Sequence, residues 1–144
     1  MWEECNRVFD RLPLSAVIDH DIYCVHGGFP RPVANFENEI QQILAVPAVA
    51  GITPPYSYES DWQQQVATDC IWSDPAREEQ ERKCNRQGFA PSLRGGDCVC
   101  FGMKAIENFC EGNGLSFIVR AHEAHAHGVS LSKAAKYKLP WCGS

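Results

Sequence analysis

The sequence has no long apolar run, no excess of basic residues and no two cysteines separated by just two residues. With 13 Lys and Arg against 18 Asp and Glu, the formal net charge is −5, which argues against nucleic-acid binding because the phosphate backbone requires a basic surface. No apolar stretch approaches the roughly 20 residues of a membrane-spanning helix, so no membrane partner is expected. The opening MWEECNRVFD carries acids where a secretory signal would be basic and then apolar. We therefore expect a cytoplasmic or nuclear protein.

The eight cysteines match neither a zinc-site spacing nor a disulfide framework. Cys98 and Cys100 are the closest pair, and in a strand they would lie on one face. Three others, Cys24, Cys70 and Cys110, lie inside apolar runs, where a free cysteine behaves as a small hydrophobic residue. Because no secretory signal is visible, we expect reduced thiols.

The composition is that of one globular domain. The 144 residues are 44% hydrophobic and 22% charged, and they contain no internal repeat and no visible domain boundary. Short β-branched or aromatic runs bounded by turn residues predict strands that should lie close together, at residues 14–19, 22–26, 70–74 and 115–119. The last of these is expected to be buried.

Helical patterns alternate with these strands, so the fold class is α/β. We expect a helix over 35–44 with Asn35 as its N-cap, and an amphipathic helix over 102–112 that ends at Gly112 or Gly114. The proline-rich stretch 45–60 predicts an irregular surface connection. The highly charged stretch 76–88 predicts a mobile loop.

The segment RAHEAHAHG, residues 120–128, raises the possibility of a metal site. A zinc-protease helix needs histidines four residues apart, whereas His122 and His125 are three apart and Gly128 follows soon after. The segment instead follows a predicted strand, and the carboxyl ends of strands are where α/β sheets place ligands. His122 is nearest the sheet. His125 and His127, like His20, are predicted to be solvated turn residues.

Five short motifs occur in order: LPLSAVI, VHGGFPRP, IWSDP, RGG followed by CFG, and RAHE. This succession resembles the carboxyl-terminal half of the catalytic domain of the phosphoprotein phosphatase family, the serine/threonine phosphatases among the calcineurin-like metallophosphoesterases. The resemblance runs from about Trp2 to about Lys136. It implies that residues 1–144 form an incomplete α/β metallophosphoesterase domain of layered sheets with outer helices, with a divergent tail at about 137–144.

The resemblance assigns roles to individual residues. In VHGG a histidine ends a strand, and Gly27 and Gly28 leave the backbone open to a phosphate or metal. The family implies that His26 and His122 bind the second of two metals, and neutral imidazoles suit manganese, iron and zinc. Arg94 resembles the arginine that clamps phosphate oxygens through its planar fork of donors.

Two further residues resemble a segment beside the substrate groove. Trp72 and Asp74 are expected to support the groups that touch metal or phosphate, and Asp74 either orients a ligand or caps the following turn. The sequence departs from the family near the phosphate arginine, because Ser92-Leu93 replaces the asparagine often found there.

The implied reaction is metal-dependent hydrolysis of phosphoserine and phosphothreonine in proteins, with phosphoprotein substrates and regulatory subunits as partners. The family's amino-terminal motifs G-D-x-H-G, G-D-x-V-D-R-G and G-N-H-E do not occur in these residues. They would bring the ligating aspartates, an asparagine and the remaining catalytic groups. We therefore expect weak or no metal binding and background hydrolysis by these residues alone.

Two hypotheses remain open: a serine/threonine phosphatase whose activity is carried by a fuller form, or a non-catalytic remnant or interaction module derived from one. A truncated gene model, a splice product and a decayed copy are equally compatible with the sequence. In each case apolar surface that the missing half would cover should be exposed, which would favour association.

Overall fold

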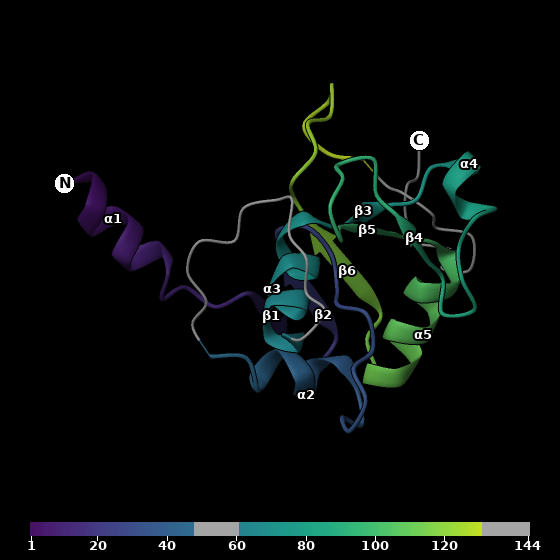
Figure 1. Cartoon of the computed structure of the whole chain (residues 1–144), viewed down its shortest axis with the longest axis horizontal. Helices are drawn as coiled ribbons and strands as arrows, with labels where there is room; N and C mark the ends of the chain where they lie inside the picture. The colour runs from purple at the N-terminus through teal and green to yellow at the C-terminus, as the bar shows by residue number, and fades with distance from the viewer. Residues whose placement is uncertain (48–60, 131–144) are drawn as a thin grey trace.

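The computed structural model describes residues 1–47 and 61–130, which form two small sheets with helices around them (Figure 1). The first sheet has the strand order β1–β2–β6, and the second has the order β3–β5–β4. Each sheet contains one parallel and one antiparallel pairing. The mixed α/β fold class predicted from the sequence is therefore confirmed.

The first sheet contains three of the four predicted strands. β1 (Ser15–Ile18) and β2 (Ile22–Val25) form an antiparallel hairpin. Asp19 and His20 between them have φ values of 51° and 57°, as the central residues of a type I′ turn require. β6 (Phe117–Arg120) then pairs in parallel with β2, so β2 and β6 end at the same edge of the sheet.

The predicted strand at 70–74 is wrong. Residues 70–72 are the last turn of α3 (Trp62–Trp72), and only Asp74 and Pro75 form a strand, β3. The helix begins at Asp61, whose carboxylate accepts hydrogen bonds from the backbone N–H groups of Gln63 and Gln64. The apolar run CIW is the carboxyl end of an eleven-residue helix that begins with WQQQVATD. The helix continues through these residues, although the run by itself resembles a strand.

The second sheet brings together short segments from the middle of the chain. β3 pairs in parallel with β5 (Val99–Phe101), which also pairs antiparallel with β4 (Phe89–Pro91). The predicted loop 76–88 contains a helical turn, α4 (Glu78–Glu81). The Glu81 carboxylate accepts a hydrogen bond from the Met103 backbone N–H at 2.7 Å, so this charged stretch is tied to the start of α5.

The other helices match the sequence to different degrees. α5 (Met103–Asn113) is confirmed and ends at Gly114, which adopts the left-handed conformation at φ 66°. α2 (Glu39–Leu44) is shorter than predicted, because its N-cap is Asn38 and not Asn35, which has φ 77°. α1 (Trp2–Phe9), not predicted, projects from the body of the molecule (Figure 1). Residues 48–60 of the predicted irregular connection, and the tail 137–144, lie outside the described residues.

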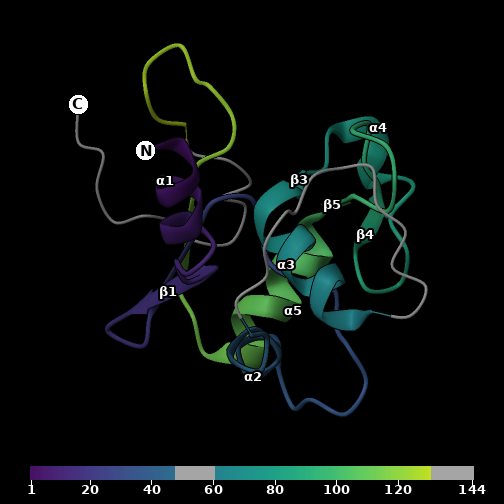
Figure 2. The same ribbon diagram turned by 60° about the vertical axis from the view of Figure 1, so that its left-hand side comes forward.

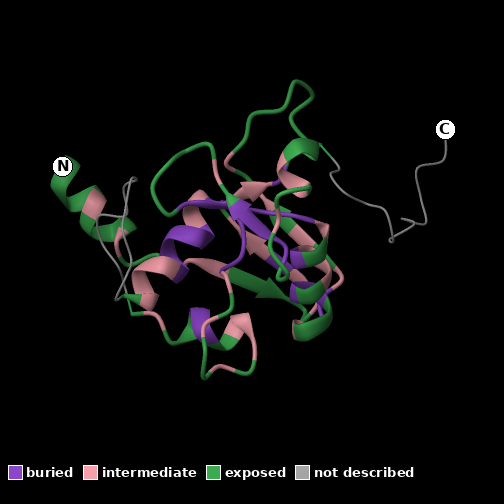
Figure 3. Ribbon diagram, turned by 45° about the vertical axis from the view of Figure 1, so that its right-hand side comes forward, coloured by how far each residue is buried: buried purple, intermediate pink, exposed green. Residues whose placement is uncertain are grey.

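Aromatic rings form the centre of the core. Phe29 stacks on Phe109 with ring centroids 4.4 Å apart, and Tyr23 meets Phe109 edge-on at 4.9 Å. The buried residues cluster where α3, α5 and β5 meet the inner side of β2 (Figure 3). Helices α2, α3 and α5 are gathered on one side of the first sheet (Figure 2), and the rings of Tyr23, Phe29 and Phe109 pack α5 against β2.

The other face of the first sheet is apolar and exposed. The pairing register places Ile18 and Phe117 on either side of Ile22, with Val119 on the same face. Ile18, Phe117 and Val119 are 49%, 42% and 55% exposed. The predicted exposed apolar surface is therefore confirmed, whereas the expectation of a fully buried last strand is wrong, because only alternate residues of β6 face the core.

Two further observations concern the expectations from composition. Within residues 1–47 and 61–130, no helix is long and apolar enough to span a membrane. The cysteines of the same ranges are free thiols.

Candidate metal and phosphate site

Four segments meet at the carboxyl ends of β2 and β6. His26 and Gly27 follow β2, and His122 follows β6 by two residues. Asp74 begins β3 immediately after α3, and Arg94 lies in the turn between β4 and β5. The parallel pairing of β2 with β6 explains why residues 96 positions apart along the chain become neighbours.

The two histidines predicted to share a metal are in contact. His26 Nε2 lies 2.9 Å from His122 Nδ1, with ring centroids 4.7 Å apart. Two nitrogens each about 2.1 Å from one ion and at a right angle to each other would be roughly 3.0 Å apart. The spacing therefore fits either an imidazole–imidazole hydrogen bond or two adjacent ligands of one ion. The residues described contain no group of three or more His, Cys, Asp or Glu that could hold a metal, so the pair provides only part of a coordination sphere.

His122 lies in a constrained piece of backbone. Its φ is 66°, and the N–H of Glu123 donates to the Ala121 carbonyl at 2.8 Å, which closes a three-residue turn around His122. A γ-turn with a positive central φ is rare and strained. Burial, followed by the positive charge of Arg94, lowers the pKa of His122. Both effects favour the neutral imidazole that can bind a metal.

Asp74 connects this histidine with two arginines. Its Oδ2 accepts from Arg94 Nε at 2.7 Å, and its Oδ1 accepts from Arg120 Nη2 at 2.9 Å. His122 Nε2 is buried without a hydrogen bond and lies 3.9 Å from the same Oδ1. Asp74 therefore fixes the direction of the Arg94 guanidinium and lies near the His122 ring, but beyond hydrogen-bond distance of it; its role in orienting a ligand stays a prediction.

Arg94 and Trp72 border the imidazole pair. The Arg94 guanidinium lies 5.8 Å from the Trp72 ring centroid, and that ring meets the His122 ring edge-on at 5.5 Å. The hydrogen bond to Asp74 raises the pKa of Arg94. Arg94 also lines a cavity of about 210 Å³ together with Asp74 and Glu123, so its permanent charge faces a space open to solvent.

The two glycines after His26 are required by packing. A Cβ at Gly27 would come within 2.6 Å of the Ile71 backbone, and one at Gly28 would overlap Ser73 and the Phe101 ring. Both glycine N–H groups donate to the Cys70 carbonyl, at 2.8 and 3.3 Å. The glycines thus allow β2 to pass close to the end of α3. The approach of a phosphate or metal to their backbone stays a prediction.

The site also contains an arginine to which the sequence had given no role. The Arg120 side chain is only 13% exposed and donates to Gly27 O, Ser73 O and Asp74 Oδ1 on two other segments, and to Glu123 Oε2 three residues ahead in its own segment. The signal that could have found it is its position, because it is the last strand residue before His122. His20, His125 and His127 are exposed turn residues, as predicted.

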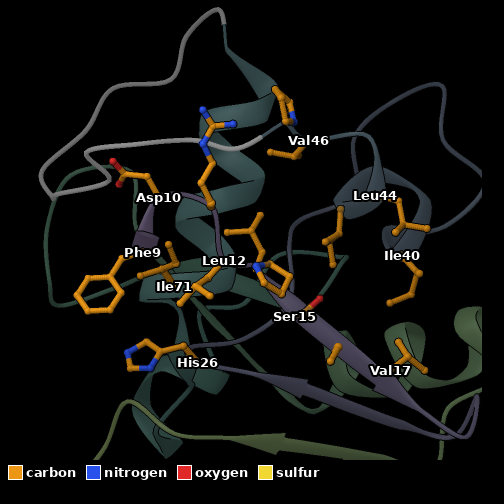
Figure 4. Close-up of a pocket in the computed structure, with 16 residues that line it drawn as sticks. Phe9, Asp10, Leu12, Ser15, Val17, His26, Ile40, Leu44, Val46 and Ile71 are labelled. Atoms are coloured by element: carbon orange, nitrogen blue, oxygen red, sulfur yellow. The ribbon is translucent and has the colours of Figure 1, made fainter. Parts of the chain in front are cut away.

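A larger groove of about 640 Å³ also has His26 in its lining, together with residues from β1 and α2. Figure 4 shows His26 at one end of this groove, with Leu12, Ile71 and Ser15 beside it. Most of the remaining lining is apolar and comes from the segment after α1, from β1 and from α2.

Comparison with known proteins identifies the family of this chain. The calcineurin-like phosphoesterase family model matches residues 1–126, so the chain belongs to that family. The serine/threonine-protein phosphatase BSL2 of Arabidopsis thaliana is 33% identical over all of this chain, and the serine/threonine-protein phosphatase 2B catalytic subunit A1 of Saccharomyces cerevisiae is 29% identical over 94% of it. The homologues are thus serine/threonine protein phosphatases, and the predicted family is confirmed.

A solved structure supports the fold. A protein serine/threonine phosphatase from Saccharomyces cerevisiae, with similarity to human phosphatase PP5, matches 81% of this chain at a TM-score of 0.57 and 26% identity. The match covers 30% of that chain, and this protein spans 13% and 23% of the lengths of the two curated relatives. The family typically binds two metals.

Proposed function

We propose that this chain supplies the second-metal histidines and one phosphate-binding arginine of a serine/threonine protein phosphatase. The observation that carries the proposal is the 2.9 Å approach of His26 Nε2 to His122 Nδ1 beside the Arg94–Asp74 pair. In this proposal, residues 1–144 are the carboxyl-terminal half of a catalytic domain, and its substrates are phosphoserine and phosphothreonine in proteins. The reaction is hydrolysis in the cytoplasm or nucleus, with regulatory subunits as partners.

Each residue of the site has a distinct task. His26 Nε2 and His122 Nδ1 would hold one ion, and manganese, iron or zinc suit such donors. A two-metal centre supplies an activated water and neutralises charge on the transferred phosphoryl group. The Arg94 fork binds phosphate oxygens, and Asp74 fixes the direction of that fork. Once His122 Nδ1 is engaged, its Nε2 would carry the proton and face Asp74 Oδ1, which lies 3.9 Å away and beyond hydrogen-bond distance.

We also propose that the 144 residues are inactive by themselves. Two neutral nitrogens do not offset the charge of a dication, and no third ligand lies beside them in the described part of the chain. We infer that the carboxylates and the asparagine implied by the family must come from residues that carry its G-D-x-H-G, G-D-x-V-D-R-G and G-N-H-E motifs.

A non-catalytic interaction module is the second candidate. The observation that favours it is the exposed apolar face of the first sheet, which includes Ile18, Phe117 and Val119. In this alternative the imidazole pair remains as a structural contact, and addition of the motif-bearing half does not produce turnover.

The deciding experiment combines this chain with a separately expressed segment of a relative that carries the three missing motifs. Manganese-dependent hydrolysis of a phosphopeptide is expected in the mixture and not with either part alone. Turnover should be lost in His26→Ala and His122→Ala, and should persist in His125→Ala, the matched control in the exposed turn. Absence of turnover from a folded, associated mixture would overturn the phosphatase proposal.

A further inference from the structure

The strained turn at His122 needs a source of support. A residue with positive φ persists in a γ-turn only where surrounding contacts determine its conformation. The sequence after the turn offers little such support, because residues 124–130 are exposed. On the other side, the N–H of Ala121 donates to the His26 carbonyl at 3.0 Å, which extends the β2–β6 pairing by one bond.

The remaining contacts come from Arg120. Its Nη1 donates to the Glu123 carboxylate, and because Glu123 is three residues ahead, this ion pair spans the His122 turn. Its Nε donates to the carbonyl of Gly27, the residue after His26. Its Nη2 donates to Asp74 Oδ1 at 2.9 Å and lies 3.4 Å from the Ser73 carbonyl. One guanidinium thus fixes the turn that carries His122 against the strand end that carries His26.

We infer that Arg120 is a positioning residue that sets the distance between the His26 and His122 imidazoles before any ligand binds, with Glu123 as its anchor across the turn. The inference rests on the proposed function, because it concerns how the same metal-side pair is held. Arg120 does not touch substrate or metal. It acts through the backbone of Gly27 and through the turn around His122.

Only an arginine can make this set of contacts. The acceptors bind Nε, Nη1 and Nη2 and come from two other segments and from Glu123 across the turn, so they require donors that diverge from one rigid group. A lysine at position 120 would keep the charge and could reach Asp74 or Glu123, but its single ammonium group cannot also reach the Gly27 carbonyl from the same position. Arg120→Lys therefore tests geometry and leaves the charge unchanged.

The experiment uses the full metal-free chain with isotopically labelled histidine. Unchanged protein should show a nuclear Overhauser effect between the ring protons of His26 and His122, together with slow exchange of the Ala121 amide. In Arg120→Lys we expect loss of the ring contact and at least a roughly tenfold faster exchange of the Ala121 amide, with unchanged signals from Tyr23 in the core. Arg82→Lys is the matched control, because Arg82 also pairs with a glutamate but on the exposed surface of α4.

A second variant keeps the test decisive if Arg120→Lys does not fold. Glu123→Gln removes only the ion pair across the turn and should weaken the ring contact in a chain whose core is intact. Retention of the ring contact and of slow Ala121 exchange in the folded variants would overturn the inference. Phosphatase turnover is not part of this readout. Absence of turnover in the two-part mixture would therefore leave the result for Arg120 unaffected, and a negative result for Arg120 would leave the test of the proposed function unaffected.

Discussion

Two arginine–aspartate clusters lie near the carboxyl end of α3, one in its last turn and one just beyond it, and they differ in how completely they are closed. Asp69 is fully buried and receives three hydrogen bonds from Arg31, one from its backbone N–H and two from its guanidinium. Asp74, five residues later, is 17% exposed and is shared between Arg94 and Arg120, with His122 beyond hydrogen-bond distance. The first cluster satisfies its charge by itself, whereas the second leaves an imidazole nitrogen unsatisfied and an arginine at a cavity.

We infer from this difference that the Arg31–Asp69 pair serves the fold, whereas the Asp74 cluster can serve a ligand site. A buried carboxylate whose hydrogen bonds are all made by one arginine stabilises the fold and can do little else. A carboxylate that is divided between two arginines and faces a histidine can change partners when a ligand arrives. The predictions below test this contrast.

The largest effect is expected at the closed cluster. Asp69→Ala leaves the partly buried Arg31 guanidinium without its partner and should lower the free energy of unfolding by about 3–5 kcal/mol. Urea denaturation of the 144-residue chain measures this loss. The control is Glu78→Ala, because the Arg82–Glu78 pair is exposed on both sides and its loss should change stability by less than about 0.5 kcal/mol. Equal effects in the two variants would remove the contrast between closed and exposed pairs.

At the open cluster the main effect should be on activity. Asp74→Asn keeps the shape of the side chain but removes the charge that orients Arg94 and faces His122. In the two-part mixture we expect turnover to fall by about 10- to 100-fold, as is usual when a group that orients a metal ligand is changed. Turnover equal to that of the unchanged chain would return Asp74 to a purely structural role.

A third prediction concerns pH and the buried core beside the site. Burial raises the pKa of the Cys70 thiol to about 12 from its ordinary value of 9.0. Folding therefore holds this thiol neutral, and its contribution to stability is complete below pH 9 and is lost as pH rises toward 12, because the unfolded thiol ionises first. At pH 10 the loss from this residue is about 1.4 kcal/mol. The free energy of unfolding should be measured by denaturation at pH 8 and pH 10 for the unchanged chain and for Cys70→Ala. Its decrease between the two pH values should be smaller in Cys70→Ala by that amount, and an equal decrease in both proteins would contradict the raised pKa of Cys70.

The smallest effect is expected on the exposed face of the first sheet. Val119 is 55% exposed, so Val119→Thr should change the free energy of unfolding by less than about 0.5 kcal/mol. Ile118, its neighbour on the core side of β6, packs against the aromatic cluster, and Ile118→Thr should cost more. Comparable destabilisation by both variants would show that the outer face is covered in solution.

The predictions from sequence were correct for elements whose local residue pattern indicates the same structure that their tertiary contacts stabilise. The strands at 14–19, 22–26 and 115–119 carry their own turn signals, and the helix at 103–113 has a periodic apolar face and a terminal glycine. The strand predicted at 70–74 failed because its apolar run is also compatible with a helix, and the N-cap that decides the matter is Asp61, nine residues earlier.

The site followed a similar rule. His26, His122, Arg94, Trp72 and Asp74 were found from short motifs, and the structure brings them together. The contacts of Arg120 were not visible in the sequence, because three of its four acceptors, Gly27, Ser73 and Asp74, lie at least 46 residues away along the chain. Short motifs thus identified residues that gather at the site, but not the side-chain network that connects them.

A zinc titration of the 144-residue chain tests most directly whether the imidazole pair is half of a metal site. The account predicts one weak site, measured by calorimetry, that is lost in both His26→Ala and His122→Ala and retained in His125→Ala. Binding is expected because the two nitrogens lie 2.9 Å apart. It is expected to be weak because no third ligand joins the two imidazoles in the described residues. Zinc binding that is the same in the unchanged chain and in His122→Ala would contradict the account.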